Sequence, residues 1–216
     1  MANAGAKVVV NRHGRGTTAI TYGLAHADGT RQMITFNGTN LQFEEKDIDY
    51  GLVRKADHLH RSGFWWCPNL WGETTRKLMR VAQDNGAETS LDIGTDPEGW
   101  TEQRRERVYK ALEFTDVFFG NETEITNLAQ KKGLRVAADV LLDMGVKSVV
   151  AHLGPKGSGL MTKRGVIKLP AFKIAPRNPI GSGDIFNAGF VCARSKGWNE
   201  ERCLTFANAC AAYYME

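Results

Sequence analysis

Residues 116–154, DVFFGNETEITNLAQKKGLRVAADVLLDMGVKSVVAHLG, decide the fold of this chain. The stretch begins and ends with short apolar runs, at 116–120 and 147–154, whose length is typical of buried strands. Two segments with helical spacing, at 122–131 and 135–144, lie between these runs, and a glycine follows each. Two strands joined by helices predict a βαβ unit, in which the strands run parallel and the helices cover the sheet.

The alternation of strands and helices continues on both sides of this stretch. The expected fold class is therefore α/β, with a mostly parallel sheet and helices on both of its faces. A second hairpin is predicted where the runs GLMT and VIKLP flank Lys163-Arg164-Gly165. The other predicted elements are strands at 57–63 and 89–94, helices at 73–85 and from Thr101, and C-terminal helices at about 183–196 and 200–214.

The N-terminal part of the chain has a different character. Residues 17–37 carry small polar and β-branched side chains in two runs, TTAITYGLA and QMITFNG, which predict two paired strands. Asp28-Gly29 lies between them, and glycine tolerates the positive φ of a tight hairpin turn. We therefore expect a small β element within residues 1–45 that stands apart from an α/β core at residues 46–216.

The strongest chemical signal is a small-residue loop that opens directly into a predicted helix, Gly181-Ser182-Gly183-Asp184. Glycines let backbone N–H groups approach a ligand, and the first turn of a helix attracts an anion. A carboxylate beside a bound phosphate is electrostatically unfavourable unless it has a chemical role. One such role is to accept the proton of an attacking hydroxyl group, so Asp184 is a candidate general base. A plain helix N-terminus with a dipole-favourable aspartate also explains these residues, and both interpretations stay open at this point.

Four motifs in a fixed order resemble the ribokinase-type, or phosphofructokinase-B-type, carbohydrate kinases. GSGDIFNAGF at 181–190 resembles the family's DTxGAGDxF signature, and NETE at 121–124 follows a strand as the family's N-x-x-E motif does. HLGPKG at 152–157 is similar to its T-x-G-x-x-G nucleotide turn, and FANA at 206–209 to the part of its last helix that approaches the nucleotide. The resemblance covers nearly all of residues 17–216 and implies a ribokinase-like, Rossmann-like fold with a β lid near the N-terminus.

The resemblance implies ATP-dependent transfer of a phosphoryl group to a hydroxyl group of a sugar or nucleoside, assisted by Mg²⁺. Asp184 would be the general base. The backbone N–H groups around Gly181, Ser182 and Gly183 would stabilise the charge on the transferring phosphoryl group. The residues implied for binding the nucleotide are Asn121, His152, Gly154, Lys156, Gly157 and Asn208.

The same resemblance implies a metal site formed by Glu124 and Asn121. Mg²⁺ keeps several of its waters, so Glu124 would act through a water molecule. An asparagine followed three residues later by a glutamate is also the pattern of a helix capping box, and both roles can hold together. Gly154 and Gly157 are equally typical of a turn, and a lone histidine such as His152 is more often a strand-end residue than a catalyst.

The chain departs from the family pattern in three places. Asn178-Pro179 stands where the family usually has Asp-Thr, and a neutral asparagine weakens or removes the site for an activating monovalent cation. Nothing before residue 17 resembles the family's glycine-rich substrate segment, and the sequence stops at Glu216, before the loops that complete the nucleotide pocket. We therefore expect the ATP-side part of a kinase. A fragment, a split reading frame and a degenerate homologue stay open, as does a non-catalytic nucleotide-binding or scaffold module.

An aromatic loop, FWWCPNLW at 64–71, follows the predicted strand at 57–63. Ligands of open α/β sheets bind at the carboxyl ends of strands, so these rings are candidates to stack on a sugar or a base. A contact with the lid or a subunit interface is the alternative. If nothing covers Phe64, Trp65 and Trp66, their exposed area favours association of the chain.

The composition is that of a folded protein. Of 216 residues, 42% are hydrophobic and 24% charged, which argues against a disordered tail or a coiled-coil rod. No apolar run reaches the length of about 18 residues that indicates a membrane span, and the N-terminal MANAGAKVVVNRHG lacks the apolar core of a signal peptide, so we expect a cytoplasmic protein. The four cysteines lack the spacing of a metal site, and Cys203 and Cys210 are expected to be buried thiols on one helix face.

The net charge of +4 is too small to indicate a nucleic-acid-binding protein. Its distribution is uneven, because no acidic residue lies between Asp143 and Asp184. Such a stretch attracts polyanions such as nucleotides, or simply forms a solvated hairpin surface. The expected partners are therefore ATP and a sugar or nucleoside, with no nucleic acid and no membrane, and with a homodimer through the lid as an option. The basic residues of the stretch are Lys147, Lys156, Lys163, Arg164, Lys168, Lys173 and Arg177.

Overall fold

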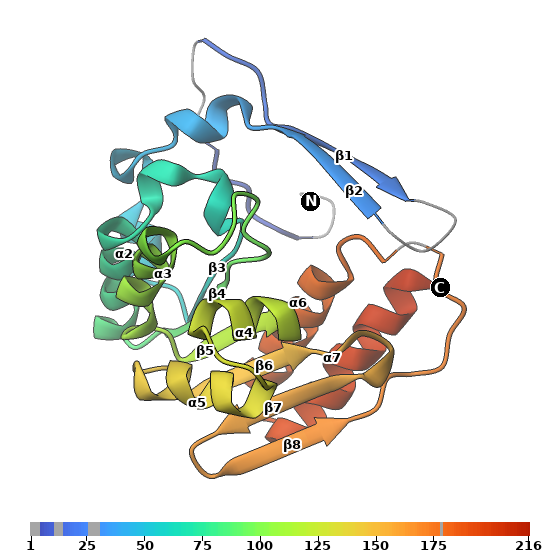
Figure 1. Cartoon of the computed structure of the whole chain (residues 1–216). Coiled ribbons are helices and arrows are strands. Elements are labelled where there is room, and N and C mark those ends of the chain that lie inside the picture. The colour runs from blue at the N-terminus through green and yellow to red at the C-terminus, as the bar shows by residue number, and fades with distance from the viewer. Residues whose placement is uncertain (1–4, 11–14, 26–30, 178) are drawn as a thin grey trace.

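The computed structural model describes residues 5–10, 15–25, 31–177 and 179–216, and its centre is a six-stranded sheet (Figure 1). The strands lie in the order β3-β4-β5-β6-β7-β8; β3 to β6 run parallel, and β7 and β8 are antiparallel to their neighbours. The predicted α/β fold with a mostly parallel sheet and a second hairpin is confirmed. The strands are β3 (His58–Arg61), β4 (Glu88–Asp92), β5 (Val117–Asn121), β6 (Ser148–His152), β7 (Ser158–Thr162) and β8 (Gly165–Leu169).

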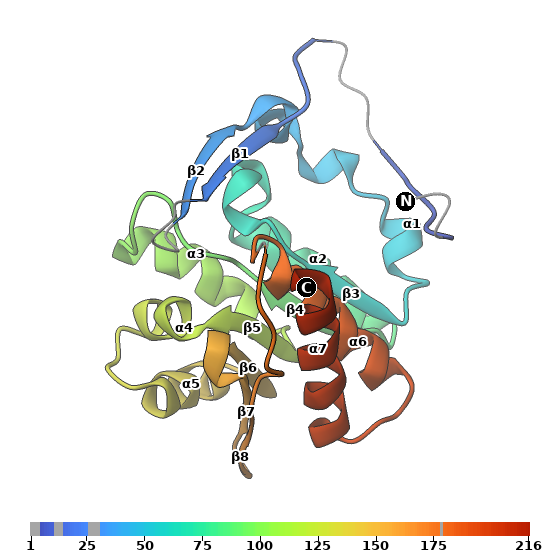
Figure 2. The same cartoon turned by 90° about the vertical axis from the view of Figure 1, so that its right-hand side faces the viewer.

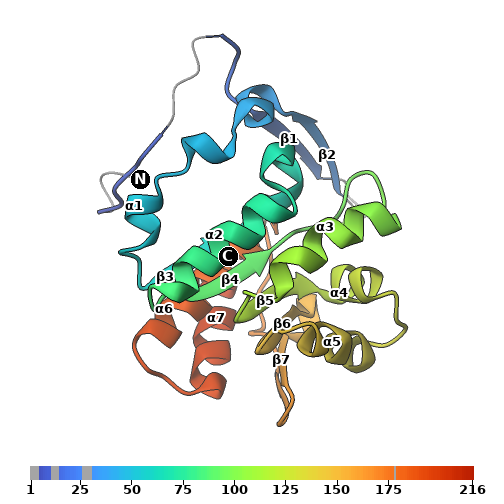
Figure 3. The ribbon, with the colours of Figure 1, turned by 90° about the vertical axis from the view of Figure 1, so that its left-hand side faces the viewer.

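Helices cover both faces of the sheet, as Figures 2 and 3 show. The alternation of side chains along β5 explains why. Phe118 packs into the core under helices α2 to α5, whereas Val117 and Phe119 pack under α6 and α7, and all three are fully buried. A strand with apolar side chains on both faces therefore needs a layer of helices packed on each face of the sheet. The helices are α2 (Glu73–Asp84), α3 (Glu102–Leu112), α4 (Glu122–Ala129), α5 (Leu134–Asp143), α6 (Ser182–Ser195) and α7 (Glu200–Met215).

Six short helical elements within the described part of the chain were not predicted from the sequence. Each has only three to five residues, which is too short to show a helical period. The helix α1 begins where the side chain of Asp49 accepts hydrogen bonds from the backbone N–H groups of Gly51 and Leu52. These elements are η2 (Gly38–Gln42), η3 (Glu45–Asp47), α1 (Tyr50–Val53), η4 (Phe64–Trp66), η5 (Pro68–Leu70) and η6 (Gly154–Lys156).

A separate two-stranded sheet stands above the main sheet in Figure 1, formed by β1 (Ile20–Ala25) and β2 (Arg31–Phe36). The strands are antiparallel, with Ile20 opposite Phe36, so the predicted pairing is confirmed; its turn, Asp28-Gly29, lies outside the described residues. One face of this sheet meets the loop before α6. A methyl group added to Gly23 would lie 2.6 Å from Cδ1 of Ile180. Glycine therefore permits the close approach of the hairpin to this loop.

Phe64 and Trp65 of the aromatic loop after β3 belong to the core, which corrects the expectation that these two rings are exposed or stack on a ligand, whereas Trp66 is half-buried. Phe64 is 0% and Trp65 4% exposed, and the Trp65 ring lies edge-on to the rings of Phe64 and Trp71. Arg104 places its guanidinium 4.7 Å from the Trp65 ring centroid and 5.0 Å from that of Trp71. Its Nε donates to Oδ2 of the buried Asp96 over 2.7 Å. The stacking of Arg104 on the two indole rings and its ion pair with Asp96 hold the aromatic loop against α3.

None of the helices in the described ranges is long and apolar enough to cross a membrane. Cys203 is buried at the contact of α7 with the sheet, whereas Cys210 on the same helix is only half-buried. The expectation of two fully buried thiols is therefore confirmed for the first residue alone. Within the same ranges, no three His, Cys, Asp or Glu side chains are grouped so that they could hold a metal ion.

We expect the substitution Arg104→Met to lower the free energy of unfolding by about 3–5 kcal/mol, because it leaves the carboxylate of Asp96 buried without its counter-charge. Arg107→Met is the matched control. The guanidinium of Arg107 also lies over Trp71, at 5.3 Å, but outside the ion pair with Asp96, so its loss should cost about 1 kcal/mol or less. Urea unfolding of both variants measures the difference. Equal losses would show that the buried ion pair does not hold the aromatic loop.

Candidate active site

The carboxyl ends of three parallel strands meet the N-terminus of α6 at one edge of the sheet. Asp92 ends β4, Asn121 ends β5 and His152 ends β6, with Asn121 and His152 paired in register. Gly183 of α6 lies against the imidazole of His152, since an added methyl group would be 3.5 Å from Cε1 and 3.6 Å from Nδ1. The sequence-predicted residues from three distant motifs are therefore neighbours. Ligands bind at such an edge in open α/β sheets.

The first turn of α6 is built by the small-residue loop. Gly181 adopts a left-handed conformation (φ +85°, ψ −4°), which a residue with a side chain rarely takes, and it places the next residue at the start of the helix. Ser182 donates from Oγ to the carbonyl of Pro179 over 2.8 Å, so its hydroxyl group holds the loop. The N–H groups of a first helical turn have no acceptor within the helix. Asp184 lies in this turn with its side chain exposed.

The motif at 121–124 forms a capping box at the start of α4, as the sequence predicted. Oδ1 of Asn121 accepts from the N–H of Glu124 over 2.9 Å, and Oε2 of Glu124 accepts from the N–H of Asn121 over 2.8 Å. The other oxygen, Oε1, accepts from the hydroxyl group of Thr95 over 2.8 Å. Each carboxylate oxygen keeps a further lone pair. This arrangement fits a magnesium ion held through water better than one bound directly.

Two residues of the site were missed by the sequence analysis. Nε2 of His152 lies 2.8 Å from Oδ1 of Asn187, and Nδ2 of Asn187 donates to Oδ2 of Asp92 over 2.6 Å. The backbone N–H of Gly94 donates to the other oxygen of Asp92. Removal from water raises the pKa of the Asp92 carboxyl group; the nearby His152 opposes this shift and Glu124 adds to it. Two features of the sequence could have indicated them: Asp92 lies in the second half of the predicted strand at 89–94, and Asn187 follows Asp184 by about one helical turn.

The predicted nucleotide turn is the short element η6 after β6. The N–H of Leu153 donates to the carbonyl of Gly157 over 2.9 Å, which closes the turn. Gly154 and Lys156 are exposed, whereas Gly157 is buried. At φ +96°, a methyl group on Gly157 would lie 2.0 Å from the carbonyl oxygen of Leu169. The structure therefore requires a glycine at 157 for the turn itself, whatever else this residue does.

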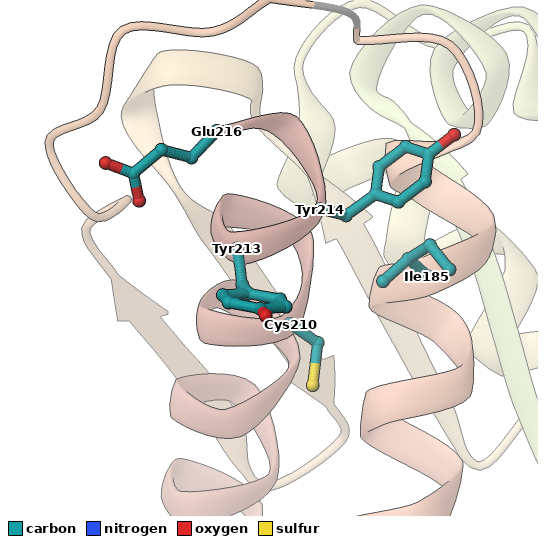
Figure 4. Close-up of a pocket in the computed structure, with 5 residues that line it drawn as sticks. All are labelled: Ile185, Cys210, Tyr213, Tyr214 and Glu216. Carbon is teal, nitrogen blue, oxygen red and sulfur yellow. The ribbon is translucent and has the colours of Figure 1, made fainter.

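Asn208 and a surface pocket lie on the α7 side of the molecule. Asn208 is 7% exposed, and its amide donates to the carbonyl of Pro170 over 3.4 Å. The pocket in Figure 4 lies between α6 and α7 and has a volume of about 640 Å³. No sequence-predicted site residue lines it. Its lining residues are Ile185, Cys210, Tyr213, Tyr214 and Glu216.

Comparisons with known proteins agree with this architecture. The model of the pfkB family of carbohydrate kinases matches residues 3–216. The ATP-dependent ribose-1-phosphate kinase of Halopiger xanaduensis is 29% identical over 198 residues, which are 91% of this chain and 61% of that protein. A nucleoside kinase of Methanothermobacter thermautotrophicus is 33% identical over 145 residues, 67% of this chain and 43% of that protein.

The solved structures share the ribokinase-like fold. The structure of Arabidopsis thaliana ribokinase complexed with ribose and ATP superposes with a TM-score of 0.76 at 24% identity, covering 93% of this chain and 64% of the ribokinase. The chain thus spans about three fifths of the length of the ribose-1-phosphate kinase, and slightly more of the ribokinase.

We expect Gly157→Ala to lower the free energy of unfolding by about 3 kcal/mol or more, because both its φ and the nearby Leu169 carbonyl exclude a side chain. Gly154→Ala is the matched control in the same turn. Its φ is +57°, and an added methyl group would meet nothing within 4 Å, so its cost should be near 1–2 kcal/mol. Thermal and urea unfolding compare the two variants. Equal costs would mean that the close approach at 157 does not constrain the turn.

Proposed function

The chain belongs to the pfkB family of carbohydrate kinases, and we propose that it acts in the ATP-dependent transfer of a phosphoryl group to a hydroxyl group of a sugar or nucleoside. The observation that carries this proposal is the position of the α6 N-terminus beside the ends of β5 and β6, where Asn121 and His152 lie. The relatives support the acceptor class, since their names cover ribose-1-phosphate, nucleosides and, in a complex with ATP, ribose.

In this proposal Asp184 is the general base. As the acceptor oxygen attacks the γ-phosphorus, its proton passes to the exposed carboxylate, and the bond from phosphorus to the ADP oxygen breaks. The N–H groups around Gly181, Ser182 and Gly183 are proposed to stabilise the charge of the transferring group, and that of Ser182 also donates to the carbonyl of Pro179 over 3.2 Å. They are fixed by the helix and the Ser182 hydroxyl bond, so they need no rearrangement as the charge develops.

The metal in this proposal is held by Glu124 through water, at the edge where Asn121 caps α4. Mg²⁺, when bound, neutralises charge on the phosphates of the nucleotide. The capping box fixes the carboxylate, and Thr95 fixes its second oxygen. We propose no strong site for a monovalent cation; the residue on which this rests, Asn178, lies outside the described ranges.

The nucleotide in this proposal lies along the turn that follows β6. Gly154 and Lys156 are exposed there, so a phosphate chain can reach both the backbone and a cationic side chain. His152 begins this segment beside the first turn of α6. The amide of Asn208, on α7, is the proposed contact for the base end of the nucleotide.

We expect Asp184→Asn to keep the affinity for Mg-ATP and to lower turnover by about 10²–10⁴-fold, because the backbone N–H groups remain while the proton acceptor is lost. Calorimetric titration with Mg-ATP measures the first quantity, and phosphate transfer to a panel of sugars and nucleosides measures the second. Glu201→Gln is the matched control, since Glu201 is also a first-turn acid, in α7, but lies outside the proposed site.

The outcomes separate three cases. Near-normal turnover of Asp184→Asn would place the base elsewhere. No nucleotide binding by folded wild-type chain at millimolar Mg-ATP would contradict the proposed function. Binding without transfer to any acceptor would favour the alternative, a non-catalytic nucleotide-binding module.

The lid supports a second proposal, a homodimer. Strand alternation puts Ile20, Tyr22 and Leu24 on one face of the two-stranded sheet, with Ile34 and Phe36 opposite them, and each of the five is at least 45% exposed. The other face carries Gly23, which meets Ile180. An exposed apolar face of this kind favours association, and a second copy of the chain offers the same face in return.

We expect light scattering to find a dimer of the wild-type chain and a monomer of Tyr22→Lys, because the lysine places a charge at the centre of the apolar face. Val166→Lys is the control, since Val166 is 43% exposed but lies on β8, away from the lid. A monodisperse wild-type monomer would contradict the proposal.

A further inference from the structure

The loop between β4 and α3 is fixed on both sides of Thr95. On one side, the N–H of Gly94 donates to Asp92, and its carbonyl accepts from Nε1 of Trp65 over 3.3 Å. On the other side, the carboxylate of Asp96, whose side chain is 0% exposed, is bound by Arg104. Thr95 therefore sits between two anchored neighbours, although its own side chain is exposed.

Arg104, which binds Asp96, also contacts the aromatic loop. The guanidinium lies over the rings of Trp65 and Trp71, and Trp71 in turn donates from Nε1 to the carbonyl of Phe64 over 2.6 Å. A cation stacked on two indoles and paired with a buried carboxylate has little freedom to move. The aromatic motif, which the phosphoryl-transfer proposal does not use, thus serves to hold the β4–α3 loop in place.

The fixed loop places the hydroxyl group of Thr95 beside the carboxylate of Glu124. Oγ1 of Thr95 lies 2.8 Å from Oε1, the oxygen that the capping box leaves available, while Oε2 accepts from the N–H of Asn121. A hydroxyl donor to a carboxylate makes a charge-assisted hydrogen bond. With both oxygens held, the plane of the carboxylate is set. Without Thr95, the carboxylate can turn about its single remaining bond to the backbone.

We propose that Thr95 is a positioning residue that orients the carboxylate of Glu124 toward the water shell of the nucleotide-bound magnesium ion. The inference rests on the proposed function and extends it to a residue outside every motif of the resemblance. Hydrogen-bond partners of metal-associated carboxylates set the affinity for the metal, because they fix the direction of the lone pairs. The effect of Thr95 should therefore appear in the Mg²⁺ requirement rather than in the affinity for ATP at saturating metal.

The test is calorimetric titration of ATP into the full chain at a series of Mg²⁺ concentrations, which needs no turnover. We expect Thr95→Val to raise the Mg²⁺ concentration for half-maximal gain in ATP affinity about tenfold. Thr95→Ser, which keeps the hydroxyl group, should return it to near the wild-type value. Thr126→Val is the matched control, because its hydroxyl group lies on the same helix as Glu124 but donates to the carbonyls of Glu122 and Thr123 rather than to a carboxylate.

An unchanged Mg²⁺ requirement in Thr95→Val, or an equal rise in Thr126→Val, would overturn the inference while leaving the proposed function intact. A rise in both Thr95→Val and Thr95→Ser would also overturn it, since the hydroxyl group would then not be the cause. Failure of the folded wild-type chain to bind ATP at any Mg²⁺ concentration would instead overturn the proposed function, and this inference with it.

Discussion

The whole arrangement depends on the burial of β5 on both faces. Val117, Phe118 and Phe119 carry no polar side chain, so each face of the sheet needs a layer of helices. With both faces covered, the polar side chains of β5 and β6 lie at the ends of these strands. Asp92, Asn121 and His152 accordingly meet at the carboxyl edge. The chemistry of the site is thus a consequence of the same apolar run that determines the fold.

The resemblance of four short motifs predicted the fold, and the structure brings residues of three of these motifs together, at Asn121, His152 and Gly183. Each motif could be recognised in the sequence because it is local. A glycine loop before a helix and an asparagine before a glutamate are read within a few residues, and the structure places both at helix starts. The positions of strands and helices could also be predicted, because apolar runs and helical spacing are local patterns in the sequence. The bounds differ by a few residues at most elements, as at β3, where the predicted 57–63 is observed as His58–Arg61.

What the sequence did not reveal depends on contacts between distant residues. Asn187 bonds Asp92 across 95 positions, and Thr95 bonds Glu124 across 29. The aromatic loop was misjudged for a related reason. Three adjacent aromatic residues suggest an exposed ligand platform, but Arg104 of α3, paired with Asp96 of the β4–α3 loop, covers the ring of Trp65. Only the folded chain shows that this cation and carboxylate lie beside the indoles.

Three carboxylates converge on the proposed site, and their partners differ in a way that fits the proposed division of roles. Asp92 accepts from Gly94 and Asn187, and Glu124 from Asn121 and Thr95, so both are held by the protein. Within the described ranges, the carboxylate of Asp184 has no hydrogen-bond partner, and its side chain is exposed in the first turn of α6. A carboxylate that exchanges a proton must be open to its substrate, whereas one that orients a metal must be fixed. Asp184 meets the first requirement and Glu124 the second.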